Sequence, residues 1–218
     1  MAAAGRLLRV DIYRKLREEI LDCSLKPGSD LREQRLASRF SVSKSPVRDA
    51  LLRLERESLI TIAPRQGYRV APISLSDARE MFRLRAVLEM ASALEAARSA
   101  TDDGLESLDR FRTFRGGEGS AGFIAYNRDF HCALVRLSGN RRMTAAACDL
   151  IEQMNRLVKI SVATMRERRS GGLVREHCAI IDALQARDGR RASALLRAHI
   201  EAADHRVADG LSRAAVHP

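Results

Sequence analysis

The sequence predicts a mainly α-helical protein, with an N-terminal winged helix-turn-helix that includes a small β-hairpin (residues 1–73) and a C-terminal all-α helical bundle (residues 76–212). In the first third of the chain, three segments with apolar residues at helical spacing precede two short segments rich in β-branched and aromatic residues. Beyond residue 121, apolar residues recur only at helical spacing. The composition is rich in Leu, Ala, Arg and Glu, which favours helix.

Turn residues and helix caps set the expected limits of the elements in the N-terminal domain. A first helix over 11–22 carries an apolar stripe and ends before a Pro-Gly turn, and a second follows over 32–40. Ser43 is the expected N-cap of the third helix, because its hydroxyl can accept a hydrogen bond from an amide of the first turn. Two short strands, over 59–63 and 68–71, then flank a basic turn.

The bundle is expected to open with a long helix from Ser76 to about residue 100. The apolar residues of this helix are expected to face the core: Leu84, Val87, Leu88, Ala91 and Leu94. Glycine-containing breaks then separate five further expected helices: 104–114, 120–137, 141–168, 172–187 and 189–212. Helices of these lengths joined by short breaks are typical of a helical bundle.

Positive charge is denser at the start of the chain. The whole sequence has 38 Lys and Arg against 28 Asp and Glu, and residues 1–75 have 15 against 9. A basic N-terminal domain is compatible with a nucleic-acid partner, because Lys and Arg neutralise phosphates. The charge alone does not decide whether the protein binds a nucleic acid.

The cysteines and the hydropathy of the sequence indicate in which cellular compartment the protein is located. The four cysteines contain no CxxC pair, and we interpret them as reduced thiols in small buried positions, with redox chemistry as the less favoured alternative. We expect no signal peptide, and no apolar run approaches the roughly 20 residues of a membrane span. We therefore expect a cytoplasmic protein without a membrane partner.

The third helix of the N-terminal domain has a core-facing side and an open side. Its core-facing positions are apolar: Val47, Ala50, Leu51 and Leu54. Lys44, Ser45 and Arg48 remain on the open side, where Lys44 and Arg48 lie one turn apart and point the same way. The second helix of a helix-turn-helix enters the major groove with its first residues, and Arg can bind guanine there in bidentate fashion. We interpret this face as a surface for double-stranded DNA rather than as a solvated charged face.

The segment LKPGSDLREQRLASRFSVSKSPVRDALLRLERESLITIAPRQGYRV, residues 25–70, resembles the winged-helix domain of the GntR family. The resemblance is carried mainly by the Pro27-Gly28 turn and by the run VSKSPVRDAL over residues 42–51. It implies these DNA-contacting residues: Gln34, Ser43, Lys44, Ser45, Arg48, and Arg65 and Gly67 of the wing.

The segment departs from the family pattern at three helix ends. The family usually has Gly where Ser41 and Ser58 stand, and a non-Gly residue there costs about 1 kcal/mol if its φ is positive. Arg32 stands where a capping Asn, Ser or Asp is common, so we expect a weakly capped second helix.

Three histidines lie on apolar helical faces of the predicted bundle: His131, His177 and His199. One inward His is usually a core residue with a satisfied hydrogen bond. Three on separate helices are costly to bury without a shared partner, and a divalent transition metal is such a partner. Asn127 precedes His131 by one turn and offers an amide oxygen on the same face.

The runs NRDFHCALVRLSGN, REHCAIIDAL and LLRAHIEAAD resemble the FCD effector domain of the FadR subfamily. The resemblance implies a metal (zinc, nickel or manganese) that helps bind a carboxylate effector, held by Asn127, His131, His177 and His199, with Asn127 in place of the commoner Asp. FRLRAVLEMASALEAA matches the first bundle helix, where Arg85 is implied to bind the effector carboxylate. A salt bridge between Arg85 and Glu89 on the helix surface is the equally weighted alternative.

We therefore expect a ligand-responsive transcriptional regulator, with repressor as the favoured role. A homodimer would bind a double-stranded DNA operator, and a small organic acid at the metal would change its affinity. We expect no enzyme and no catalytic residue. Two other classes stay open: a metal-dependent hydrolase fused to a DNA-binding domain, against which no HExxH-like motif is present, and an architectural DNA-binding dimer without an effector.

Overall fold

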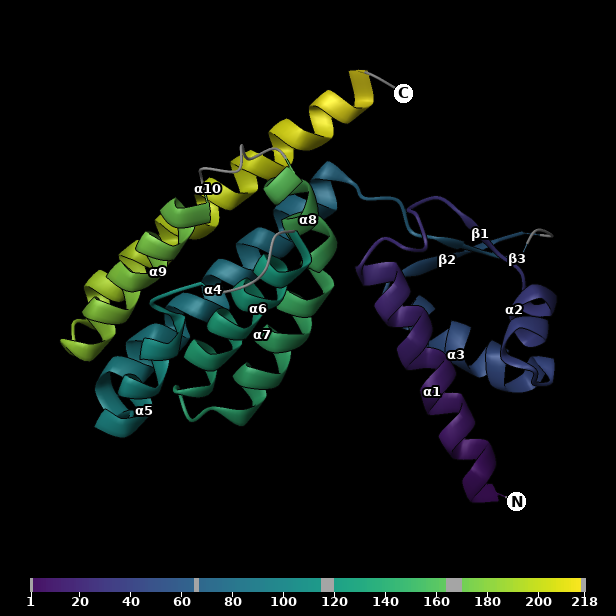
Figure 1. Ribbon diagram of the computed structural model, residues 1–218, viewed down its shortest axis with the longest axis horizontal. Coiled ribbons are helices and arrows are strands. Elements are labelled where there is room, and N and C mark those ends of the chain that lie inside the picture. The colour runs from purple at the N-terminus through teal and green to yellow at the C-terminus, as the bar shows by residue number, and fades with distance from the viewer. Residues whose placement is uncertain (1, 65–66, 115–119, 164–169, 217–218) are drawn as a thin grey trace. The chain divides into compact units, whose positions relative to one another are not determined.

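The computed structural model describes residues 2–64, 67–114, 120–163 and 170–216, with side chains in 11–64, 67–114, 121–160 and 171–213 (Figure 1). The chain divides into two compact units, residues 1–73 and 74–218. We call them the head and the helical unit. Among the described residues, no helix is both long and apolar enough to cross a membrane.

The head consists of three helices and a three-stranded antiparallel sheet. In chain order its elements are α1 (Ala2–Leu21), β1 (Asp30–Leu31), α2 (Glu33–Phe40), α3 (Lys44–Arg56), β2 (Ile60–Ala63) and β3 (Gly67–Val70). The strand order is β1-β3-β2, with Tyr68 opposite both Leu31 and Ile62. The winged helix-turn-helix prediction is confirmed. The two-residue strand β1 was not predicted, because so short a strand shows no alternation.

Helix α1 begins at Ala2 and not at residue 11, because the Ala-rich and Leu-rich residues before Asp11 continue the helix. Its stripe packs against α3, and the core side predicted for α3 is buried as expected: Val47, Ala50, Leu51 and Leu54. Arg32 gives α2 no side-chain cap, which also agrees with the sequence.

The capping role predicted for Ser43 is wrong in one respect. Ser43 occupies the N-cap position of α3, but its side chain makes no capping hydrogen bond. A capping hydroxyl accepts from the amide two or three residues on, and the third residue after Ser43 is Pro46, which has no N–H. The Ser43 hydroxyl is exposed instead.

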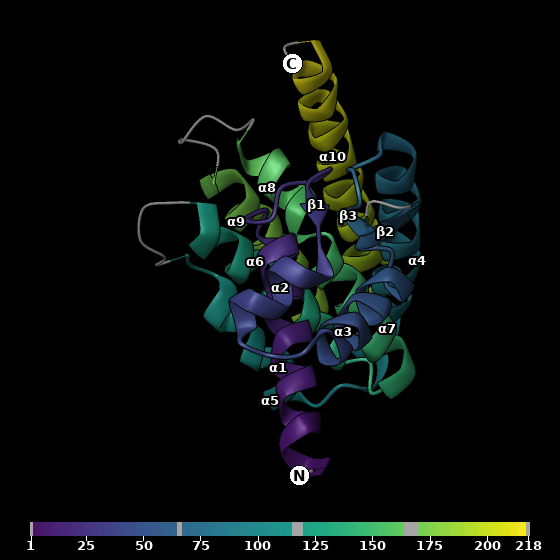
Figure 2. The ribbon, with the colours of Figure 1, turned by 90° about the vertical axis from the view of Figure 1, so that its right-hand side faces the viewer.

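The helical unit contains, in chain order, α4 (Leu75–Ser99), α5 (Asp102–Glu106), the 3₁₀ helix η1 (Ser107–Phe111), α6 (Ser120–Arg136), α7 (Arg141–Gln153), α8 (Asn155–Ala163), α9 (Ser170–Gln185) and α10 (Gly189–Val216). Helices α4 and α10 run side by side, as both views show (Figures 1 and 2). Alanines of α4 bring them close: a Cβ at Gly189 would lie 3.1 Å from the Cβ of Ala97. The all-helical prediction is confirmed.

The helix predicted over 104–114 is two shorter elements. Thr101 caps α5 through a bond from the amide of Gly104, so the helix starts at Asp102. The Ser107 hydroxyl then bonds back to the Gly104 carbonyl, which competes with continued α-helix. Leu105 of α5 and the η1 residues Leu108 and Phe111 are buried at a spacing of three, which suits the tighter 3₁₀ helix.

The helix predicted over 141–168 ends at Gln153, and α8 starts at Asn155 after a break at Met154. No Pro or Gly marks this break. Met154 and Leu157 are both almost completely buried, and α8 packs against α6 and α10. Tertiary packing rather than a local sequence signal therefore ends α7. Residues 164–169 of the predicted helix lie outside the described residues.

The face predicted for the long helix α4 is wrong. Leu84, Val87 and Leu94 are exposed to 52%, 65% and 46%, and Ala91 is exposed as well, while Leu88 packs against the core. The inward face carries small and charged residues instead, among them Ala93, Ala96, Arg85 and Glu89. The helix also begins at Leu75, capped by Ser74, one residue before the predicted start.

Candidate metal centre and DNA-contacting surface

The first turn of α3 presents polar side chains to solvent. Ser43, Lys44, Ser45 and Arg48 are all exposed around the start of the helix, and Gln34 is exposed at the start of α2. The buried side of α3 fixes this orientation, because Val47 and Leu51 are fully enclosed in the head core. These predicted DNA-contacting residues are therefore accessible to solvent on the head.

Arg48 is paired with Glu33 of α2. Its Nε and Nη2 each donate to one Glu33 carboxylate oxygen at 2.9 Å, and its side chain remains 59% exposed. The hydrogen bond from Arg48 lowers the pKa of Glu33, so the carboxylate stays ionised. One edge of the guanidinium is thus already hydrogen-bonded within the protein. Its remaining donor atoms can still reach another group.

The wing depends on Gly67. Gly67 has φ +100°, and a Cβ at this position would lie 3.0 Å from the carbonyl oxygen of Leu31. Both the positive φ and the close approach of β1 therefore favour glycine. Gly67 is half-buried at the start of β3. Arg65, the other predicted wing residue, lies outside the described residues.

Three histidines from three helices meet in the helical unit: His131 on α6, His177 on α9 and His199 on α10. Their ring centroids lie 4.9–5.3 Å apart, and one nitrogen from each lies within 4.8 Å of the others. All three are buried, at 5% exposure or less. The structure brings together the predicted metal-binding histidines.

Carboxylates fix the proton position in two of the three rings. The Nδ1 of His131 lies 2.6 Å from a Glu89 oxygen, and the Nδ1 of His199 lies 2.6 Å from a Glu176 oxygen. An ionised carboxylate can only accept, so each Nδ1 donates its proton. The lone pair of each ring is then on Nε2.

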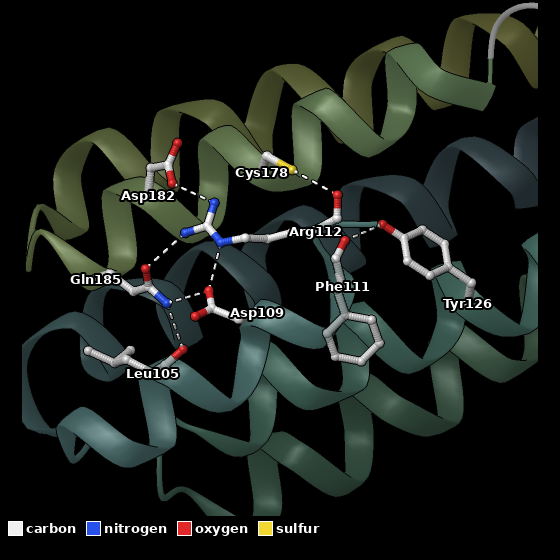
Figure 3. A network of polar contacts seen from close by, with 8 residues as sticks. All are labelled: Leu105, Asp109, Phe111, Arg112, Tyr126, Cys178, Asp182 and Gln185. Atoms are coloured by element: carbon white, nitrogen blue, oxygen red, sulfur yellow. Dashed lines mark hydrogen bonds and ion pairs between the residues drawn. The ribbon is translucent and has the colours of Figure 1, made fainter. Parts of the chain in front are cut away.

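Tyr126 fixes the proton of the third ring. The Tyr126 hydroxyl donates to the carbonyl oxygen of Phe111 at 2.7 Å, as Figure 3 shows. Its single proton is used there, so at 3.1 Å it must accept from Nδ1 of His177. His177 therefore also has its lone pair on Nε2. Within the described part of the chain, Nε2 of His131 and Nε2 of His177 are buried without a hydrogen-bond partner.

Burial keeps the three imidazoles neutral. It lowers the pKa of His131 to about 3, and the Arg85 guanidinium adds to this effect. Burial also lowers the pKa of His177 well below the ordinary value, and lowers that of His199. Neutral imidazole is the form that binds metals, and nitrogen donors suit divalent transition ions.

Arg85 and Glu89 form the predicted ion pair, but it is buried rather than at the helix surface. Arg85 is 2% and Glu89 0% exposed, and Nε of Arg85 donates to Glu89 at 2.5 Å. Burial alone would raise the pKa of Glu89, but Arg85 and His131 outweigh it and hold the pKa at about 2. Glu89 thus links Arg85 to the histidine cluster.

A pocket borders the histidine cluster. It holds at most about 340 Å³ of empty space and is lined mainly by α4, α6 and α10. Its polar lining consists of four residues: Arg85, Asn127, His199 and Arg206. The rest is apolar: Phe82, Phe123, Val158, Leu173, Ala203 and Val207. Asn127, the predicted fourth metal ligand, therefore lines the same pocket as His199.

Sequence reasoning did not find the groups that orient the histidines. Glu89 was considered only as a partner of Arg85, and Tyr126 and Glu176 were not considered at all. Glu176 directly precedes His177 in the chain, but its partner is His199, 23 residues away. Arg206 could have been predicted to line the pocket, because it lies two turns after His199 on the same helix and i, i+7 residues share a helical face.

Comparison with known proteins gives matches over both units. Residues 8–70 match the family model described as bacterial regulatory proteins, gntR family, and residues 80–202 match the FCD domain model. A Streptomyces ambofaciens HTH-type transcriptional regulator in an unstable DNA locus is 32% identical, over 98% of this chain and 89% of that protein. The HTH-type transcriptional repressor RspR of Escherichia coli K12 is 29% identical, over 87% and 84%.

Solved structures share the fold. McbR/YncC of Escherichia coli has a TM-score of 0.77 at 22% identity, covering 94% of this chain and 98% of that chain. A GntR family member from Pseudomonas syringae pv. tomato has a TM-score of 0.58 at 25% identity, covering 97% and 89%. The relatives named here are transcriptional regulators rather than enzymes.

Proposed function

This chain belongs to the GntR family of bacterial regulatory proteins and is a DNA-binding transcriptional regulator with an FCD domain, and we propose that a metal-bound organic acid controls its affinity for an operator. Since the family consists of regulators and not enzymes, the metal would serve ligand binding rather than hydrolysis. As a regulator of DNA it would act in the cytoplasm, with repressor as the proposed role.

One observation carries the metal proposal. The lone pairs of His131, His177 and His199 are all on Nε2, because each Nδ1 is committed to a different partner. Buried lone pairs without a donor are costly, and a divalent cation would satisfy them together. We propose zinc, nickel or manganese, with Asn127 as a fourth ligand. Glu89, Tyr126 and Glu176 would orient the rings from behind, as outer partners do in metal sites.

The pocket supports a small organic acid as effector. Within the described residues, Nη2 of Arg85 is buried without a hydrogen-bond partner at the pocket wall. A guanidinium is suited to a carboxylate, and Arg206 adds a second positive charge at the same pocket. The apolar lining, which includes Phe82 and Phe123, favours an acid with a short hydrocarbon part.

The head would bind double-stranded DNA through α3. Lys44 and Arg48 are exposed one turn apart, and we propose that they enter the major groove. The other proposed contacts are Gln34, Ser43, Ser45, and Arg65 and Gly67 of the wing. Pairing with Glu33 would restrict the Arg48 side chain before DNA binds, which reduces the conformational entropy lost on binding.

We propose a homodimer that is built on α4. Its exposed residues Leu84, Val87, Ala91 and Leu94 recur at spacings of three, four and three, which is the seam pattern of paired helices. Pairing two copies along this seam would cover apolar side chains that one copy leaves in water. A two-fold dimer would present two α3 helices to successive major grooves of a near-palindromic operator.

Effector binding would act by population shift. An acid that binds one arrangement of the dimer more tightly changes operator affinity by the ratio of its affinities for the two arrangements. Residues 72–76, which join the head to α4 and include its first two residues, would carry the change. The effector site contacts α4 through Phe82 and Arg85, so it borders the same helix that bears the seam.

The test combines metal analysis with DNA binding. Protein purified without a His tag is analysed for metal, alongside His177→Ala and the control His205→Ala, whose residue is exposed on α10. Wild type and control should retain about one metal per chain, and His177→Ala should lose it. Small carboxylates are then screened for a rise in Tm with and without chelator, and active ones for a change in operator affinity.

The alternatives give different results. A protein without metal and without acid-induced stabilisation, which still binds DNA, would be an architectural dimer. An acid could raise Tm only when metal is present but leave operator affinity unchanged. That result would support the proposed metal and acid site and contradict the proposed control of operator affinity by the acid.

A further inference from the structure

Arg112 fastens the end of η1 to α9, as Figure 3 shows. It directly follows η1 in the chain. Its guanidinium donates from Nε to Asp109 of η1 at 2.7 Å, and from Nη1 and Nη2 to two residues of α9, Asp182 at 2.7 Å and Gln185 at 2.9 Å. Each of the three nitrogens thus has its own acceptor, so the Arg112 backbone is held at a fixed position beside α9.

The backbone that Arg112 anchors contacts two side chains next to the histidine cluster. The peptide group between Phe111 and Arg112 donates its N–H to a carbonyl oxygen of η1 at 3.0 Å, and its carbonyl oxygen accepts from the Tyr126 hydroxyl at 2.7 Å. The next carbonyl oxygen, that of Arg112, accepts from the Cys178 thiol at 3.5 Å. Cys178 directly follows His177 on α9. The Phe111 carbonyl is therefore held on both sides.

The direction of the Tyr126 O–H bond decides which nitrogen of His177 carries the ring proton. The hydroxyl oxygen lies 3.1 Å from Nδ1 of His177. While the Phe111 carbonyl takes the hydroxyl proton, Nδ1 must donate and Nε2 has the lone pair. Without that carbonyl, the hydroxyl could turn and donate to Nδ1, which would place the ring proton on Nε2. A protonated Nε2 has no lone pair for a metal.

We propose that Arg112 is a positioning residue, which keeps the proton of His177 on Nδ1. It acts by holding the Phe111 carbonyl where the Tyr126 hydroxyl donates to it. The cluster itself favours the other tautomer when no metal is bound. Nε2 of His177 is buried without a hydrogen-bond partner among the described residues, and a proton there would lessen the cost of neighbouring buried lone pairs. The bonds made by Arg112 oppose this change.

The other two histidines are held in a different way. Nδ1 of His131 and Nδ1 of His199 each lie 2.6 Å from a carboxylate oxygen. An ionised carboxylate only accepts, so these two rings keep their proton on Nδ1 whatever happens at η1. His131 and His199 are therefore internal references for a change that should be confined to His177.

Arg187 offers a matched control. Its guanidinium also joins two segments, because it donates to the carbonyl oxygen of Ala100 at 2.6 Å and to Asp102. Its side chain is exposed to 38%, close to the 32% of Arg112. The described bonds of Arg187 reach the end of α4 and the start of α5, and not the carbonyl that accepts from Tyr126. Loss of Arg187 should therefore cost stability without changing a tautomer.

The experiment records ¹⁵N NMR spectra of the imidazole nitrogens in metal-free, full-length protein at neutral pH, with signals assigned by single histidine variants. In wild type all three clustered histidines should carry the proton on Nδ1. In Arg112→Met, His177 should move at least partly to the Nε2–H form, while His131 and His199 stay unchanged. Arg187→Met should leave all three as in wild type. An unchanged His177 tautomer in Arg112→Met would overturn the proposal.

Two further variants test the route. Tyr126→Phe removes the hydroxyl through which Arg112 acts, so His177 should move to the Nε2–H form, and adding Arg112→Met should change the tautomer no further. A further change in the double variant would mean that Arg112 acts by another route, which contradicts the proposal. Arg112→Lys keeps the charge but cannot reach three acceptors in the same way, so it should shift His177 in the same direction by less. It replaces Arg112→Met if that variant does not fold.

The consequence for metal binding rests on the proposed function. Substituting partners behind a metal ligand weakens metal binding about 10- to 100-fold, so the zinc affinity of Arg112→Met should fall about tenfold. Competition with a chelating dye measures it, and Arg187→Met should match wild type. A shifted tautomer with unchanged zinc affinity would refute the link to metal binding. If wild type does not bind zinc at all, the metal centre fails while the tautomer result stands.

Discussion

In the head, the charged residues that we propose to act lie on the surface around an apolar core, whereas in the helical unit they lie inside the core. Lys44 and Arg48 are exposed, but Glu89, His131 and Arg85 are buried almost completely. A surface group can be replaced without disturbing the packing beneath it, while each buried polar group needs a partner. Substitutions of the functional residues in the head should therefore reduce function without reducing stability. In the helical unit, substitutions of the functional residues should change both.

The largest expected effect is on DNA binding by Lys44→Ala combined with Arg48→Ala. Each base or phosphate contact is worth about 1–3 kcal/mol, so operator affinity should fall by about two to four orders of magnitude. Because both side chains are exposed, Tm should stay within about 2 °C of wild type. Fluorescence anisotropy at fixed salt and thermal melting measure the two quantities.

Arg56→Ala is the control, since Arg56 is exposed at the other end of α3. It removes a positive charge but should cost less than tenfold in affinity. Unchanged affinity in the double variant would end the assignment of α3 as the DNA-reading helix.

The second prediction concerns acid and the helical unit without metal. The pKa of His131 is lowered to about 3, and those of His177 and His199 are also lowered, so all three stay neutral in the folded state. Below the ordinary value of 6.5 the unfolded chain takes up protons that the folded chain does not, so stability falls as pH falls from 6.5 towards 3. At pH 5.5 His131, whose pKa is lowered to about 3, alone costs about 1.4 kcal/mol, and the lowered pKa values of His177 and His199 change stability in the same direction.

Thermal melts of chelated protein between pH 7.5 and 5.5 test this. His177→Leu should reduce the pH dependence of the free energy of unfolding, because one imidazole that is buried in the neutral form is removed. His205→Leu is the control, since His205 is exposed and lies outside the histidine cluster. If Tm changes equally with pH in wild type and in His177→Leu, the histidines are not buried in the neutral form as proposed.

The third prediction concerns the exposed seam of α4. Val87→Glu places a charge on each copy at the proposed two-fold contact, where the like charges repel and apolar burial is lost. The dissociation constant of the dimer should rise at least about tenfold, equivalent to about 1.4 kcal/mol. Analytical ultracentrifugation over a concentration series measures it.

Ile62→Glu is the matched control in the head. Ile62 on β2 is exposed to 58%, close to the 65% of Val87, but it stands alone rather than in a heptad series. It should leave the dissociation constant unchanged. If the two variants weaken the dimer equally, exposure of an apolar side chain rather than the α4 seam governs assembly.

The same contrast explains what could be predicted from the sequence. In α3 the four apolar residues predicted to face the core are all buried, so helical periodicity placed Lys44 and Arg48 on the open face correctly. In α4 periodicity selected the wrong face, because Arg85 and Glu89 are inside and Val87 is outside. Periodicity detects apolar faces but does not distinguish the protein core from an apolar face left exposed.

The partners of the histidines were beyond the sequence for a different reason. His131 and Glu89 are 42 positions apart, and His177 and Tyr126 are 51 apart. Such contacts depend on how α4, α6 and α9 pack, and no local pattern encodes them. The histidines themselves were found because each lies on an apolar face of its own helix, where an unpaired imidazole is unexpected.

The smallest expected effect is on the backbone of the head. Ser41 ends α2 in the left-handed region at φ 53°, and Ser58 follows α3 at φ 57°, so the strain expected if φ were positive is present at both. Ser41→Gly should stabilise the head by about 0.5–1 kcal/mol, because glycine adopts positive φ without a Cβ clash. Ser38→Gly, three residues earlier inside α2, should destabilise it by a similar amount, since glycine there only adds freedom to the unfolded chain. Both side chains are exposed, so operator affinity should not change in either variant. Urea unfolding of the two variants measures the difference; shifts of the same sign would mean that backbone strain does not decide the residue at this helix end.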